Sequence, residues 1–225
     1  MVIIGRATDS LMLFLLTLLS VSIGPARIRA NVIFPTIGPV TVLAHSPKLD
    51  REPRAFLAFQ QRPSDILRFQ FEMGQDASPQ DVTAAPFPVR FAVVKISGFP
   101  SPLVVATAGS HGGSDAAFET MIIGETGGSL KELSKRFNTS IQDCICIGSS
   151  PQSPEILLFT FSWTDESHYA PHYFTLTTFI WNGSKFVELD ARATKRKVRS
   201  WRAAAREFGV SCKMDLTELL IPDER

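Results

Sequence analysis

The sequence predicts a mainly β fold in which a four-stranded antiparallel, blade-like unit occurs twice, preceded by a hairpin and followed by one α-helix. Three observations predict it. Short apolar runs alternate with turns rich in Gly, Pro, Asn and Asp. The order of strand, Ser-His loop and strand occurs twice, and the strands that begin at Leu130 and Phe186 are 56 residues apart (186 − 130). After residue 197 the apolar period changes from two to about 3.6.

Residues 1–30 are expected to form a secretory signal peptide. An apolar run over residues 11–23 is followed by small residues, and cleavage is expected after Ala26 or Ala30. The run is shorter than the about 20 residues that a membrane helix needs. An uncleaved anchor over residues 11–23 is the alternative, because two arginines follow the run and positive charge there resists translocation. We therefore expect a secreted or periplasmic chain, which contacts a membrane only if this segment is retained.

Residues 31–225 are expected to form a single β-rich domain, and residues 31–90 supply its first strands and a linker. An apolar stretch over residues 40–44 predicts one strand. Residues 56–60 and 66–73 predict a hairpin, because a turn with Pro and Asp joins them. A segment rich in Pro, Ala, Asp and Ser then leads to the repeats. The part before this linker is too short to bury a core alone, so we expect it to pack against the rest.

Two units of about four strands follow, over residues 91–136 and 141–197. In each unit an apolar strand entered through a Ser-Pro step leads into a loop with a Ser-His step, and a partner strand and a Gly-containing turn follow. The turn of the second unit contains Asn182-Gly183, which is typical of hairpins. Such a recurrence indicates a duplicated sheet, with the two Ser-His loops at equivalent places. Two unrelated meanders with similar turns are the alternative.

The unit resembles the blades of FG-GAP or VCBS-type β-propellers in its length and in the strand-turn-strand sequence Phe-Ile-Trp-Asn-Gly-Ser-Lys-Phe-Val that begins at Phe179. The resemblance covers residues 91–197 and implies blade-like sheets that pack side by side. The Asp-rich calcium loop of that family is absent from both Ser-His loops. The resemblance therefore implies no calcium site in this chain.

An amphipathic helix is expected within residues 198–225. Gly209 stands where the helix would end with a left-handed cap. Four apolar residues share one helical face: Val198, Trp201, Ala205 and Phe208.

A basic patch surrounds this helix in the sequence. Seven basic residues lie between positions 190 and 207 with no acid among them. The basic patch consists of Arg192, Lys195, Arg196, Lys197, Arg199, Arg202 and Arg206. It would bind a polyanion such as lipid headgroups, cell-wall polymer or nucleic acid. The alternative is a solvated helix face that only covers the sheet.

Three cysteines are present, Cys144, Cys146 and Cys212. Cys144 and Cys146 share a strand face, but Cα atoms two residues apart on a strand are about 6.5 to 7 Å apart, at the limit for a bridge. Cys212 is therefore expected to pair with one of them, and we favour Cys146, with Cys144 as the alternative. A disulfide is typical of a chain outside the cytoplasm. No Cys-x-x-Cys motif is present, so neither a zinc ribbon nor a thioredoxin-like centre is expected.

The two Ser-His loops carry the side chains from which a ligand site would be built. The candidate ligand-binding residues are His111, Asp115, Asp165, His168, Tyr169 and His172. Three imidazoles and a carboxylate suit Zn²⁺, but Pro171 excludes the helix on which the His-x-x-x-His pair would align. No cofactor is therefore expected, and zinc is the alternative. A hydrolase would use Ser110 or Ser114 as nucleophile, although the Gly-x-Ser-x-Gly elbow is missing.

Composition and charge indicate an ordinary globular protein, with 44% hydrophobic and 20% charged residues and a net charge of +1. This balance excludes a strong nucleic-acid or membrane-surface bias for the chain as a whole. We expect a non-catalytic secreted or periplasmic binding module for a protein or polymer ligand, without a specific nucleic-acid partner. The alternative is a metal-dependent or Ser/His hydrolase that uses the loops of His111 and of His168 and His172.

Overall fold

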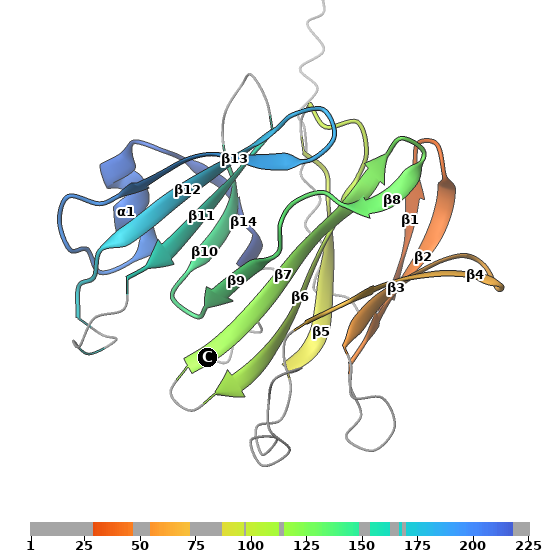
Figure 1. Cartoon of the computed structure of the whole chain (residues 1–225), viewed down its shortest axis with the longest axis horizontal. Coiled ribbons are helices and arrows are strands. Elements are labelled where there is room, and N and C mark those ends of the chain that lie inside the picture. The colour runs from red at the N-terminus through yellow and green to blue at the C-terminus, as the bar shows by residue number, and fades with distance from the viewer. Residues whose placement is uncertain are drawn as a thin grey trace, which may run out of the picture.

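A computed structural model describes residues 29–46, 55–72, 87–96, 98–112, 115–148, 154–162, 167 and 170–217, without the side chains of residues 87–88 and 110–116. Within these ranges the chain forms fourteen strands and one helix. The strands build three antiparallel sheets that follow one another along the chain (Figure 1). The predicted mainly β fold is therefore confirmed.

The first sheet is a four-stranded meander rather than a lone hairpin. Its strands are β1 (Arg29–Phe34), β2 (Gly38–His45), β3 (Phe56–Arg62) and β4 (Asp65–Gln70), paired in that order. The hairpin of β3 and β4 and the strand over residues 40–44 are confirmed. Strand β1 was not predicted, and its alternation of exposed and buried residues begins at Arg29, inside the segment expected to form the signal peptide. Residues 1–28 lie outside the described residues.

The second and third sheets confirm the two predicted four-stranded units. The second contains β5 (Phe87–Val94), β6 (Leu103–Gly112), β7 (Asp115–Thr126) and β8 (Ser129–Glu132). The third contains β10 (Cys144–Gly148), β11 (Glu155–Phe161), β12 (Phe174–Trp181) and β13 (Phe186–Ala193). Two strands were not predicted as members: β9 (Phe137–Ser140) pairs with β7, and β14 (Cys212–Asp215) pairs with β10.

The three sheets stack face to face, with the second sheet in the middle (Figure 1). Along β6, Leu103 and Val105 face the third sheet, whereas Val104 and Ala106 face the first. Both faces of the middle sheet are thus buried, which explains why its strand sequences are continuous apolar runs rather than alternating ones. Packing between sheets supplies most of the apolar core.

The helix α1 (Trp201–Phe208) covers the outer face of the third sheet. The Ser200 side chain accepts a hydrogen bond from the backbone N–H of Ala203, and Gly209 ends the helix at a φ of 69°. The predicted helix start is corrected: Val198 lies before the helix, where its backbone forms a β-bridge with His172. Among the described residues, no helix is long and apolar enough to span a membrane.

Candidate functional site

The predicted ligand site on the Ser-His loops lies largely outside the described part of the chain. Asp165, His168 and Tyr169 belong to residues that the structure does not describe, and the side chains of His111 and Asp115 are also undescribed. Both segments lie between the second and third strands of their units, as predicted, but the first is not a loop over residues 109–115. Strand β6 continues to Gly112 and β7 begins at Asp115, so His111 pairs with Ala116 in the ladder because the two long strands remain in register up to these residues. In Figure 1 the ends of β6 and β11 that lead into these loops both point toward the lower edge of the view. The site on these loops stays a prediction.

His172 is the candidate residue whose side chain is described, and its ring is buried, with 3% of its surface exposed. The ring lies edge-on to Phe161 at 5.0 Å between centroids, and its Nε2 is 3.1 Å from the carbonyl oxygen of Ser167. The backbone N–H groups of His172 and Val198 donate to each other's carbonyl oxygens at 2.9 and 2.8 Å. These contacts fix the loop against the segment that enters α1, so His172 has a packing role in the structure.

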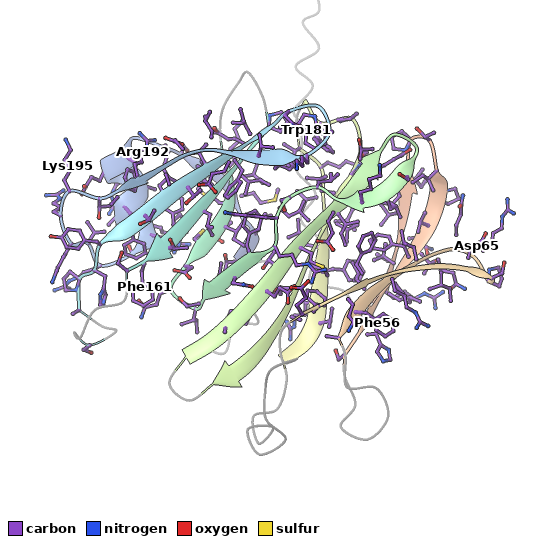
Figure 2. The ribbon with its side chains drawn as sticks, viewed as in Figure 1. Phe56, Asp65, Phe161, Trp181, Arg192 and Lys195 are labelled. Carbon is purple, nitrogen blue, oxygen red and sulfur yellow. A yellow bond between two sulfur atoms is a disulfide. The ribbon has the colours of Figure 1, made fainter. Side chains whose placement is uncertain are left out.

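The basic patch is exposed over its whole length. Arg192 ends β13, four members lie in the segment between β13 and α1, and two lie on α1. Figure 2 shows Arg192 and Lys195 at the end of the molecule that α1 covers, opposite the β3–β4 turn at Asp65. Lys213 of β14 adds an eighth exposed cation that sequence reasoning missed, because it lies beyond the run of basic residues between positions 190 and 207.

Three carboxylates lie among these cations. Glu207 accepts hydrogen bonds from the backbone N–H of Lys195 at 2.6 Å and from Arg196 Nε at 3.3 Å, so it joins the segment before α1 to the helix. Asp190 and Asp215 lie 3.8 Å from Arg192 and Arg202, respectively. Residues 190–217 contain eight basic and three acidic residues, a net charge of +5 (8 − 3). Most of the positive charge at this end is therefore not neutralised locally.

Aromatic rings hold three of the cations. Each cation lies over a ring face at a distance typical of a cation–π contact. The pairs are Arg192 over Phe208 at 5.4 Å, Arg202 over Trp201 at 4.5 Å and Lys197 over Tyr173 at 6.0 Å. Such support reduces the conformational entropy that these long side chains lose when they bind a ligand. The surface is thus partly pre-organised for an anion.

A second charged cluster lies between the first and second sheets, around Arg136. Its Nη1 is 2.7 Å from Glu119, a carboxylate with 2% exposure, and its Nε and Nη2 bond both oxygens of Glu132 at 3.1 and 2.7 Å. The hydrogen bonds to Glu132 raise the pKa of the guanidinium above its ordinary value, and burial opposes them. The other oxygen of Glu119 accepts the backbone N–H of Glu72 at 2.8 Å. This cluster ties the end of β4 to the middle sheet, so we assign it to stability.

The predicted disulfide between Cys146 and Cys212 is confirmed, with Cα atoms 5.7 Å apart, and Cys144 is a buried free thiol. The Sγ atoms of all three cysteines lie within 4.8 Å of one another. The carboxylate of Asp215 is 3.4 Å from Cys144 Sγ. Among the described residues this is the cluster with the ligand chemistry of a metal site, and sequence reasoning did not foresee it.

An open apolar groove of about 370 Å³ lies between the first sheet and the β7–β8 turn. Ile66 and Leu67 of β4 line it from one side and Leu130 from the other. Among the described residues that line it, Asp65 is the one ionisable residue.

Comparisons with protein-family models, curated proteins and solved structures find no match to this chain.

Proposed function

We propose that this protein is a non-catalytic binding module that acts outside the cytoplasm and binds an anionic polymer through the basic patch. The observation that carries the proposal is the separation of charge. Residues 190–217 carry +5, whereas the whole chain carries +1, so the remainder carries −4 (1 − 5). A field of one sign at one end of the molecule attracts and orients a polyanion.

The scaffold supports this proposal. Four-stranded meanders stacked face to face are the arrangement of adjacent propeller blades, and such folds commonly present ligand-binding surfaces on rigid sheets. Three members of the basic patch lie on β13 and α1, and the other four lie in the segment between them, which the hydrogen bond from Lys195 N–H to Glu207 ties to the helix. The helix packs on the third sheet through Trp201, Ala204 and Ala205. The cations are therefore presented by a fixed surface. Export is part of the proposal, and the confirmed disulfide is the feature that favours it.

Removal of three patch cations tests the proposal. Lys195, Arg199 and Arg206 are exposed and form no side-chain ion pair with other described residues. The triple change to Ala should weaken binding of the full chain to long-chain polyphosphate or dextran sulfate by ~100-fold at low salt, at about 1 kcal/mol per cation and 1.4 kcal/mol per tenfold. Fluorescence anisotropy with labelled polymer measures the affinity, and wild-type binding should fall steeply with added salt.

The matched control removes the same charge elsewhere. Arg62, Lys95 and Lys131 are exposed and lie outside the basic patch, so their triple change to Ala should leave the affinity within about threefold of wild type, as expected for distant charges under screening. Equal losses for the two triple variants would show nonspecific attraction and contradict the proposal. Binding to anionic vesicles but to neither polymer would assign the patch to a membrane surface instead.

A further inference from the structure

The pairing of β14 with β10 brings three sulfur atoms to one face of the third sheet. Cys144 and Cys146 point toward α1, in the alternation of β10. On β14 the register shifts by one residue: Met214 pairs with Ile147 and Cys212 with Gly148, so Lys213 is the extra residue of a bulge. Because of the bulge, Cys212 faces α1 although Met214, two residues later, packs in the opposite core.

A carboxylate completes the cluster. Asp215 lies opposite Cys146 in the ladder, and its Oδ1 is 3.4 Å from Cys144 Sγ. The backbone N–H of Thr217 donates to the same oxygen at 2.9 Å and fixes its direction. The other oxygen lies 3.8 Å from Arg202 Nη2, and the side chain is 10% exposed. The carboxylate is thus held toward the sulfurs by a neighbouring donor, as metal-binding carboxylates usually are.

The spacing of these atoms suits one metal ion. With Zn–S bonds of about 2.3 Å, two thiolates on one zinc ion stand roughly 4 Å apart. All three sulfurs already lie within 4.8 Å of one another, and after reduction the bonded pair, Cys146 and Cys212, has to separate by about 2 Å to reach the spacing of two zinc thiolates. The Asp215 carboxylate is not part of this mutually close group and, of the three sulfurs, lies against that of Cys144, so it has to turn toward the other sulfurs to act as the fourth ligand of a tetrahedral Zn²⁺ site.

We propose that Cys144, Cys146, Cys212 and Asp215 form a binding site for one Zn²⁺ ion or a similarly soft divalent ion when the disulfide is reduced. Reduction by a dithiol or a phosphine supplies two electrons, breaks the S–S bond, and with two protons gives two thiols. Metal binding then releases three thiol protons to solvent as three metal–sulfur bonds form. The three sulfurs therefore have two mutually exclusive forms. In the oxidised form two of them make a disulfide and the third is a thiol, and in the reduced form all three are thiolates bound to the metal ion. This inference is independent of the proposed polymer binding.

The burial of the cysteine side chains is consistent with both the disulfide form and the metal-bound form. In the disulfide state the Cys144 thiol is buried and donates a hydrogen bond to Asp215. A bound divalent ion supplies the positive charge that makes a buried thiolate favourable. Cys212 is only partly buried, which gives an ion a route to the cluster.

A cobalt titration of the full chain tests the site. Protein reduced with a phosphine and kept without oxygen should develop thiolate-to-cobalt charge-transfer absorption that saturates at one equivalent of Co²⁺. One equivalent of Zn²⁺ should abolish it, because zinc binds such sites more tightly than cobalt. Zn²⁺ should also raise the midpoint of thermal unfolding of the reduced protein, but not of the oxidised protein.

Two variants separate the proposed site from incidental binding. Cys144→Ser retains the disulfide pair and should fold in the oxidised state, yet after reduction it should bind Co²⁺ more than ~10-fold more weakly, since even outer-shell partners cost about 10- to 100-fold. Asp215→Asn should bind more weakly than wild type with the same sulfur absorption. Wild-type affinity in Cys144→Ser, or absence of charge-transfer absorption in the reduced wild type, overturns the proposal. A reduced chain that stays unfolded in the presence of Zn²⁺ overturns it too, because metal binding to a real site would favour folding.

Discussion

At the scale of single residues, the structure separates the exposed cations of the basic patch from the buried charges that hold sheets together. The basic patch could be predicted from the sequence because its members are close together in the chain. The Arg136 cluster could not, since Glu119 and Glu72 are far from Arg136 in sequence and meet it only where the chain after β4 packs against β7. Asp215 was missed for the same reason, as its approach to Cys144 depends on the pairing of β14.

Glu119→Gln tests the structural role of this cluster. The change removes a buried charge-assisted hydrogen bond to Arg136, so we expect a loss of about 1.5 to 3 kcal/mol in the free energy of unfolding, measured by urea denaturation. Glu188→Gln is the matched control, because its pair with Lys135 is largely exposed and should contribute under about 1 kcal/mol. Similar losses of unfolding free energy in both variants would show that the burial of Glu119 does not strengthen its contribution to stability.

At the scale of elements, strands with strong apolar runs were predicted and those that depend on partners were not. β6, β7, β11 and β12 have continuous apolar sequences and were located correctly. The short strands β9 and β14 contain polar residues, and each is a strand because a longer strand offers it an edge. The start of α1 was placed too early because the spacing of Val198 fits a helix. In the structure the bridge to His172 keeps Val198 extended, and the cap at Ser200 starts the helix after it.

Cys212→Ser tests how far the disulfide holds β14 and α1 on the third sheet. The bridge joins residues 66 apart in sequence, and its loss should cost about 2 to 4 kcal/mol in urea denaturation under oxidising conditions. Cys144→Ser should cost less than half as much, since the serine hydroxyl can still donate to Asp215. Peptide mapping without reductant checks the pairing directly. A bridge between Cys144 and Cys146 in the wild type would contradict both the structure and this expectation.

At the scale of the whole molecule, the sequence predicted the four-stranded antiparallel meanders of the second and third sheets but not the three-layer stack. The first layer includes β1, which was not predicted: of its buried positions Ala30 was assigned to the signal peptide, whereas Val32 and Phe34 lie in residues 31–90, where no strand was expected before residue 40. With β1 in place the first sheet covers one face of the middle sheet, and Phe34 and Val32 join that core. The middle position of β6 was indicated by its unbroken apolar run, but which sheet covers each face follows only from long-range packing.

The structure also favours one of the two cleavage positions that are expected for an exported chain, after Ala26 and after Ala30. Arg29 and Ala30 pair with Leu43 and Val42, and Ala30 is 6% exposed, so cleavage after Ala30 would remove two residues of β1. Cleavage after Ala26 would leave the strand whole. We therefore expect a mature chain that begins at Arg27, detected by intact-mass analysis of the exported protein.

Two shortened chains make this expectation quantitative. A chain that begins at Asn31 should unfold about 1 to 3 kcal/mol more easily than one that begins at Arg27, because it loses ladder hydrogen bonds worth roughly 0.5 to 1.5 kcal/mol each and the burial of Ala30. Urea denaturation of the two chains measures the difference. Equal stability would remove the structural reason to prefer Ala26. An exported protein that begins at Asn31 would place the cleavage after Ala30, and a membrane-bound chain that retains residues 11–23 would show an anchor instead.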